Sequence, residues 1–119
     1  MGNEKKVTGD AGEAYAAACL EAEGYRVICR NFSVRQGEID LIACDHHYLV
    51  FVEVKARRPG SMVSPEEAVD VHKQRRARCC AEYYLSRNPT PLQPRFDVMC
   101  VEHGPGGGIK LSNWIENAF

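Results

Sequence analysis

The chain has 119 residues, of which 45% are hydrophobic and 26% charged, and its formal net charge is −1. This length predicts a single domain, residues 1–119, that buries about two-thirds of its unfolded surface. The near-neutral charge gives no sign of nucleic-acid binding through overall charge, and no apolar run approaches the ~18 residues of a membrane span. No apolar segment follows the N-terminal lysines, so we expect no secretory signal, no membrane association and a cytoplasmic protein.

The first half of the chain predicts one helix and three strands. Residues 1–8 are expected to be flexible. The alanine-rich stretch 10–23 has apolar residues at helical spacing and predicts a helix that ends at Gly24. Residues 25–34, 38–44 and 49–55 have the composition of strands.

The second half begins with a polar loop and a strong helix-start signal. Ser64 is the expected N-cap, Pro65 the first helical residue and Glu67 the partner in a capping box. The helix should run to about Ser86, before the segment RNPTPLQP. Strands are expected at 95–101 and 109–115, with a glycine-rich turn at 104–108. The order αβββαββ predicts an α/β (α+β) domain built on a mixed sheet.

Six cysteines show neither a Cys-x-x-Cys motif nor the Cys/His spacing of a zinc site. Without an export signal, we expect them to be reduced thiols.

The predicted hairpin 38–55 carries charges where strands prefer β-branched and aromatic residues. With the turn at residues 45–48, Asp40 lies opposite Glu53 and Glu38 lies opposite Lys55. Strand alternation then puts these four side chains on one face with Ile42 and Phe51. The opposite face is filled by Ile39, Leu41, Ala43, Val50, Val52 and Val54.

Two opposed carboxylates destabilise a purely structural hairpin. At ~5 Å and an effective dielectric constant of about 20, they repel by roughly 3 kcal/mol. A divalent cation reverses this effect, and Mg²⁺ is commonly held by one or two carboxylates plus waters and substrate phosphate. Lys55 would then orient the attacking water or offset charge on the scissile phosphate. The structural alternative for Lys55 is a cross-strand ion pair with Glu38.

Further candidates lie outside the hairpin. Glu13 shares a helix face with Ala17 and Leu20, and its structural alternative is a capping box with Asp10. Basic residues cluster after the hairpin and on the second helix, where the alternative is a solvated helix face. They are Lys55, Arg57, Arg58, Lys73, Arg75, Arg76 and Arg78. The aromatic residues Tyr83, Tyr84 and Trp114 are expected in the core, and no stacking platform for single strands is expected.

Asp40, followed after twelve residues by Glu53-Val54-Lys55, resembles the motif of the PD-(D/E)xK nuclease superfamily. Ile39 stands where the superfamily name has proline. Blocks along nearly the whole chain resemble one bacterial group within it, the YraN-like family of predicted endonucleases, related to Holliday junction resolvases. These blocks are GEAYAAACLEAEGY, RNF, GEIDLIA, FVEVKAR, Lys73-Gln74-Arg75, Arg95-Phe96-Asp97-Val98 and Asn117-Ala118-Phe119.

The resemblance implies a restriction-endonuclease-like mixed sheet flanked by helices. It implies that Asp40, Glu53 and the Val54 carbonyl hold Mg²⁺ or Mn²⁺, that Glu13 joins this metal site or a second one, and that Lys55 is catalytic. Glu38, Lys73 and Gln74 are candidate accessory residues. Arg57, Arg58, Lys73, Arg75 and Arg76 would contact nucleic acid. A homodimer is expected by analogy with junction resolvases. Asp97 is assigned neither a structural nor a functional role.

Three functions are compatible with these observations. The leading hypothesis is a metal-dependent endonuclease that hydrolyses phosphodiester bonds in DNA, with branched or structured DNA as candidate substrates. The alternative is a non-catalytic nucleic-acid-binding or adaptor module with a nuclease-like fold. A small-molecule phosphoesterase is a third option, for which no glycine-rich phosphate cradle is present.

Overall fold

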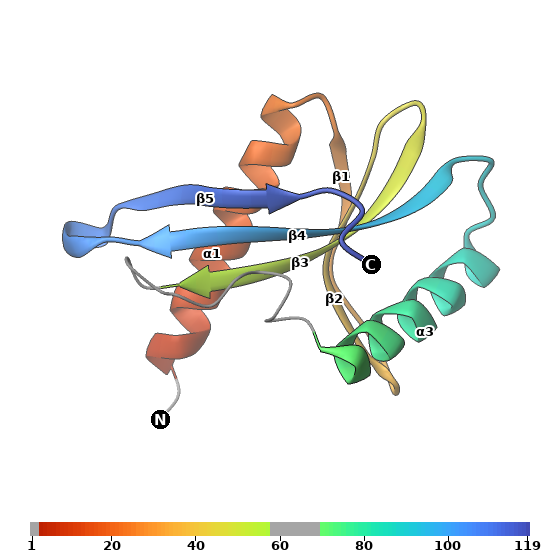
Figure 1. Ribbon diagram of the computed structural model, residues 1–119, viewed down its shortest axis with the longest axis horizontal. Coiled ribbons are helices and arrows are strands. Elements are labelled where there is room, and N and C mark those ends of the chain that lie inside the picture. Colours follow the sequence, from red (N-terminus) through yellow and green to blue (C-terminus); the bar gives the residue numbers. More distant parts are fainter. Residues whose placement is uncertain (1–2, 58–69) are drawn as a thin grey trace.

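The computed structural model describes residues 3–57 and 70–119, with side chains placed from residue 11 onward (Figure 1). Its elements follow the predicted order αβββαββ, with one short 3₁₀ helix added. They are α1 (Asn3–Ala22), β1 (Arg26–Val34), β2 (Gly37–Cys44), β3 (Tyr48–Arg57), α3 (Val71–Arg87), β4 (Gln93–His103), η1 (Pro105–Gly107) and β5 (Ile109–Ile115).

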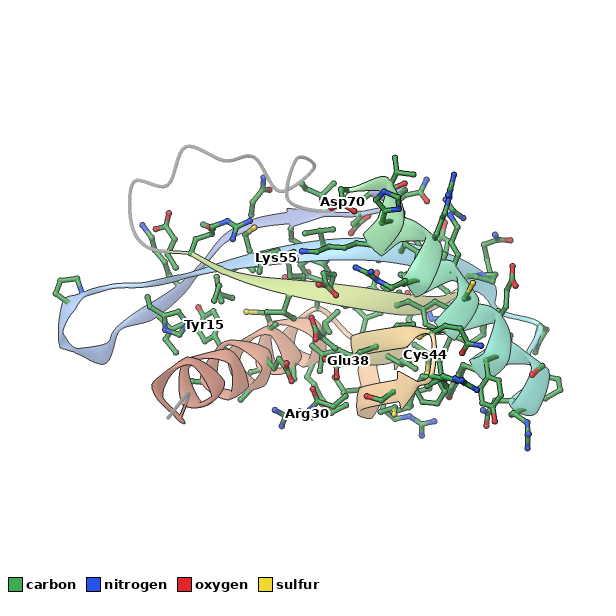
Figure 2. The ribbon with its side chains drawn as sticks, turned by 90° about the horizontal axis from the view of Figure 1, so that it is seen from below. Tyr15, Arg30, Glu38, Cys44, Lys55 and Asp70 are labelled. Atoms are coloured by element: carbon green, nitrogen blue, oxygen red, sulfur yellow. The ribbon has the colours of Figure 1, made fainter. Side chains whose placement is uncertain are left out.

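The five strands form one sheet in the order β1-β2-β3-β4-β5. Strands β3 and β4 are parallel and the other neighbouring pairs are antiparallel, so the sheet is mixed as predicted. A parallel pair needs a long crossover, and this one carries α3. Helices α1 and α3 lie against opposite faces of the sheet (Figures 1 and 2). This α+β arrangement is compatible with a restriction-endonuclease-like fold.

Each face of the sheet has its own hydrophobic core. The core under α1 contains Ala16, Leu20, Leu41, Ala43, Val50, Val52 and Met99. The core under α3 contains Ile39, Ile42, Leu49, Phe51, Cys80 and Ala81. The alternation predicted for the hairpin is therefore correct for most positions. Ile39 is the exception, because it packs with Ile42 where strict alternation put it on the opposite face.

The first helix begins earlier than predicted. Helix α1 starts at Asn3, so residues 3–8, expected to be flexible, are helical. Lysine and glutamate at positions 4–6 are good helix formers, and no proline interrupts the run. Asp10 is therefore a helix-interior position, which removes the capping box that was the structural alternative for Glu13.

The second long helix begins later than predicted. Asp70 is the N-cap of α3, and its side chain accepts a 2.9 Å hydrogen bond from the Lys73 backbone N–H. A continuous helix from Pro65 is therefore wrong, because an extended residue interrupts it at Asp70. The predicted capping box at Ser64–Glu67 lies outside the described residues.

A buried ion pair between Arg95 and Asp97 lies on the α1 side of the sheet, where β4 pairs with β5. Asp97 is fully buried and accepts two hydrogen bonds from Arg95, at 2.9 and 2.8 Å. It also accepts hydrogen bonds from the Trp114 indole N–H (2.9 Å) and the Asn117 backbone N–H (3.0 Å). Asp97 is thus a structural carboxylate that ties β4 to β5 and to the segment after it.

No disulfide joins any two of the six cysteines, all of which lie within the described residues, and their reduced state stays a prediction. None of the described helices is long and apolar enough to cross a membrane. Among the aromatic residues, Trp114 and Tyr84 pack against the cores as predicted. Tyr83 does not: its side chain is 44% exposed, because it lies on the solvent side of α3.

Candidate active site

The centre of the site is the point where β2 and β3 part. The observed pairs run from Cys44–Leu49 to Leu41–Val52, which is the predicted register. The paired stretch ends there. Beyond it, the Val54 backbone N–H donates a 2.8 Å hydrogen bond to Oδ2 of Asp40. A carboxylate therefore takes the place of a backbone partner, and this hydrogen bond holds Asp40 at the point where the two strands separate.

Asp40 and Glu53 form a pair of carboxyl groups that interact directly. Asp40 is only 9% exposed. Burial, followed by the negative charge of Glu53, raises the pKa of Asp40 to about 8, against the opposing effect of the Val54 N–H. The charge of Glu13 and a hydrogen bond between the two carboxyl groups act in the same direction as burial. Without a cation, Asp40 is therefore mainly protonated at neutral pH.

Lys55 pairs with a carboxylate on its own strand. Its ammonium lies 3.2 Å from Oε1 of Glu53, two residues earlier on β3. Glu38, the partner in the structural alternative, is exposed and accepts a 3.2 Å hydrogen bond from Ser33. The cross-strand ion pair is not the observed arrangement, because the pairing of β2 with β3 ends at Leu41–Val52, before Glu38 and Lys55 could lie opposite each other.

Lys73 reaches the site from the first turn of α3. A side-chain hydrogen bond with Lys55 and the positive charge of Lys55 lower the pKa of Lys73, while the charge of Glu53 acts in the opposite direction. Lys55 extends from β3 toward the start of α3, near Asp70 (Figure 2). Two amino groups from different elements therefore meet beside the carboxyl pair.

Lys55 is not a lining residue, but Asp40, Glu53 and Lys73 border one pocket of about 190 Å³ between the sheet and α3. It is lined by Glu38, Asp40, Glu53, Lys73, Arg76, Ala77 and Phe119. The close approach of β2 to α3 depends on Gly37, where a Cβ atom would lie 3.1 Å from that of Arg76. The fold thus brings predicted residues from β2, β3 and α3 into one cavity.

The remaining predicted residues lie around this pocket or outside it. Gln74 is half-buried on α3 and does not line the pocket. Arg75 and Arg76 are exposed on α3, and Arg57 is half-buried at the end of β3. Arg58 lies outside the described residues. Ala77 and Phe119 line the pocket although the sequence predicted a site role for neither. Phe119 belongs to the block Asn117-Ala118-Phe119, but no local pattern links the segment after β5 to a hairpin far away in the chain.

The donor set suits a hard divalent cation held by few protein ligands. Among residues 11–57 and 70–119, no three His, Cys, Asp or Glu side chains are grouped closely enough to hold a metal by themselves. Glu13, Asp40 and Glu53 are therefore not such a group, and Glu13 acts on Asp40 through its charge. Two carboxylates and waters are sufficient for Mg²⁺ or Mn²⁺. The Val54 carbonyl stays a prediction as a third ligand.

The comparisons with known proteins agree on one family. Residues 12–101 match the model of "Uncharacterised protein family UPF0102". A UPF0102 protein of Symbiobacterium thermophilum is 52% identical over 112 residues, which cover 93% of this chain and 94% of that protein. UPF0102 proteins of Caldanaerobacter subterraneus and Alcanivorax borkumensis are each 43% identical over 117 residues, covering 97% of this chain and 96% and 93% of theirs.

Proposed function

The chain belongs to the uncharacterised family UPF0102, the YraN family, and from this premise and the geometry of the pocket we propose that it is a metal-dependent endonuclease. It hydrolyses phosphodiester bonds in DNA, with branched or structured DNA as the candidate substrates. One observation carries the proposal: a pair of carboxyl groups, Asp40 and Glu53, lies directly beside a pair of amino groups, Lys55 and Lys73.

The carboxyl pair supports the metal part of the proposal. The pKa of the buried Asp40 is raised to about 8, so this group takes up a proton beside the charge of Glu53. Asp40 and Glu53 would hold Mg²⁺ or Mn²⁺, which supplies neutralisation of a phosphoryl oxygen and activation of water. The proton on Asp40 is released to solvent when the cation takes its place.

The amino pair supports the phosphate part. Two amino groups placed together repel when both are charged, which is why the pKa of Lys73 is lowered by Lys55. An anion bound between the two amino groups offsets this repulsion. The phosphate group of a phosphodiester would be such an anion, and it would lie in the pocket beside the carboxyl pair. Lys55, which contacts Glu53, would orient the attacking water or offset charge on the phosphate.

The exposed face of α3 extends this basic surface. Lys73, Arg75 and Arg76 are exposed on its first two turns. Lys73 and Arg76 also line the pocket, so a strand whose phosphate enters it passes along the helix. Contacts of this kind position a backbone and carry no base specificity.

A non-catalytic nucleic-acid-binding or adaptor module is the second candidate function. It is favoured by the same exposed basic residues of α3, because lysine and arginine neutralise phosphates whether or not a metal ion is bound. In that case the face of α3 would bind nucleic acid without metal, and binding would survive Asp40→Asn unchanged.

A cleavage assay with a substrate panel tests the proposal. Duplex, single-stranded, flapped and four-way-junction DNA, together with RNA, are incubated with Mg²⁺ or Mn²⁺ and with the wild type, Asp40→Asn or Lys55→Ala. We expect metal-dependent cutting by the wild type alone. Glu82→Gln, which changes an exposed carboxylate on α3 outside the pocket, is the matched control and should cut like the wild type. Metal-independent binding without cutting would favour the adaptor module.

A further inference from the structure

One wall of the pocket is an aromatic ring. Phe119 is half-buried and lines the cavity together with Asp40 and Glu53. Apart from Ala77, the other lining side chains are charged, from Glu38 on one side to Lys73 and Arg76 on the other. The ring is therefore the one large apolar surface among the described residues that line the pocket.

The segment that carries the ring is held against β4 by backbone hydrogen bonds. The Asn117 backbone N–H donates to the buried carboxylate of Asp97 at 3.0 Å, and the Ala118 N–H donates to the Phe96 carbonyl at 2.7 Å. Asn117 has a φ of 54°, a left-handed conformation that asparagine tolerates better than most residues. This turn directs the following residue back over the sheet toward α3.

A stack of three rings supports Phe119 from the core side. Its centroid lies 4.9 Å from that of Phe96, with an angle of 27° between the rings. Phe96 is in turn stacked on the buried Phe51, at 5.4 Å and 27°. Phe51, Phe96 and Phe119 therefore form a column of stacked rings that extends from the core to the pocket, and Phe119 is its outermost member.

The outer face of Phe119 is not covered by the neighbouring arginine. The Arg78 guanidinium carbon lies 5.3 Å from the centroid of Phe96 and 5.6 Å from that of Phe119. A group on the outer face of Phe119 would be much farther from Phe96, because the two rings are stacked. Arg78 therefore lies beside the column and does not cover the outer face of Phe119.

We propose that Phe119 is a stacking platform for the base of an unpaired nucleotide next to the phosphate in the pocket. This inference rests on the proposed function and narrows its substrate class. Stacking on an aromatic side chain accepts every base, because each has a π-face. Bases inside a duplex are already stacked on each other, so a base reaches the ring only where it has left the helix. Flaps, gaps and single strands offer such a nucleotide, whereas an intact duplex and a fully paired four-way junction do not.

A double-mutant cycle between the ring and the base tests this inference. Binding of a flapped DNA is measured by fluorescence anisotropy with EDTA present, so that cleavage cannot interfere. Single abasic sites are introduced at successive unpaired positions of the flap. For the wild type, we expect one abasic position to weaken binding about 5- to 150-fold. For Phe119→Ala, the same position should make no difference, because the partner of the base is already absent.

Three further variants complete the design. Phe119→Trp should retain the sensitivity to the abasic site, and Phe119→Leu, which keeps apolar volume over Phe96, should lose it even if Phe119→Ala does not fold. Tyr83→Leu removes an exposed ring on α3 outside the pocket and should behave like the wild type. Equal abasic effects in the wild type and Phe119→Leu would overturn the inference, as would a failure to bind any of these DNAs.

The outcome is separable from that of the nuclease proposal. If the effect of the abasic site depends on Phe119 but no DNA is cut, the base site is supported and the nuclease proposal is contradicted. If DNA is cut but the effect of the abasic site does not depend on Phe119, the nuclease proposal is supported and the base site is contradicted.

Discussion

Oδ2 of Asp40 accepts a 2.8 Å hydrogen bond from the backbone N–H of Val54, at the position where β2 separates from β3. An antiparallel ladder would satisfy this N–H with a carbonyl oxygen. Here the donor fixes a buried carboxyl group in the opening between two strands, next to Glu53. The same contact makes Asp40→Asn an informative variant, because an amide oxygen can accept the hydrogen bond without bringing the charge.

The stability of the metal-free protein should fall as the pH rises. Because the pKa of Asp40 is raised to about 8 in the folded state, the folded chain binds a proton there that the unfolded chain has released. Below about pH 4, this group contributes its full stabilisation to the free energy of unfolding. The contribution falls as the pH rises from about 4 to about 8, by up to about 1.4 kcal/mol per pH unit. Urea unfolding at intervals over this range, with EDTA present, measures the slope.

Asp40→Asn is the control for this slope, since its side chain does not titrate. The difference in unfolding free energy between the two proteins should change with pH in the window between about 4 and 8. Parallel curves for the wild type and the variant would show that Asp40 is not protonated in the folded metal-free protein. Saturating Mg²⁺ should stabilise the wild type above neutral pH more than it stabilises the variant.

Lys73→Met should weaken DNA binding and lower its dependence on salt. If Lys73 contacts a phosphate in the pocket, its loss removes about one released counterion, so the slope of log K against log salt falls by about 1. Binding is titrated at several salt concentrations in the absence of metal. Lys110→Met is the matched control, because Lys110 is 74% exposed on β5 and pairs with Glu102. A slope that is equal in wild type and Lys73→Met would remove Lys73 from the phosphate site.

Asp97→Asn should destabilise the fold strongly. The buried carboxylate accepts two hydrogen bonds from Arg95, one from Trp114 and one from Asn117. An amide presents an N–H₂ group to these donors and leaves Arg95 with only the exposed Glu116, 4.0 Å away, as a counter-charge. Breaking a buried pair in this way costs about 3–5 kcal/mol. Chemical denaturation measures the loss. Glu102→Gln, which breaks the surface pair with Lys110, should cost no more than about 1 kcal/mol, and equal effects would contradict a structural role for Asp97.

The strands that carry the site, and the register of its hairpin, can be predicted from the sequence because they depend on local patterns of residues. Alternation in the hairpin and the turn at residues 45–48 determine the register, which is observed from Cys44–Leu49 to Leu41–Val52. The predicted strand 109–115 is β5, because glycines and a proline mark its start. The sequence predicts the start of α3 too early, because the strong capping signal at Ser64 outweighs the weaker one at Asp70, which is the observed N-cap.

The contacts across the site could not be read from local patterns. Lys55 pairs with Glu53 and not with Glu38, because the separation of β2 from β3 depends on tertiary packing against β1 and α3. The same holds for Lys73, which reaches Lys55 only after α3 crosses the sheet, and for Phe119, which is positioned by a buried carboxylate on the other face. Exact alternation also failed at Ile39, next to the point of separation.

Binding of Mn²⁺ to the free protein, followed by electron paramagnetic resonance at neutral pH, tests the central claim most directly, because it needs no choice of substrate. We expect the wild type and Glu82→Gln to bind the ion alike, with release of a proton from Asp40, and Asp40→Asn to bind it at least about tenfold more weakly. Equal Mn²⁺ affinity in the wild type and Asp40→Asn would contradict a metal site at the carboxyl pair.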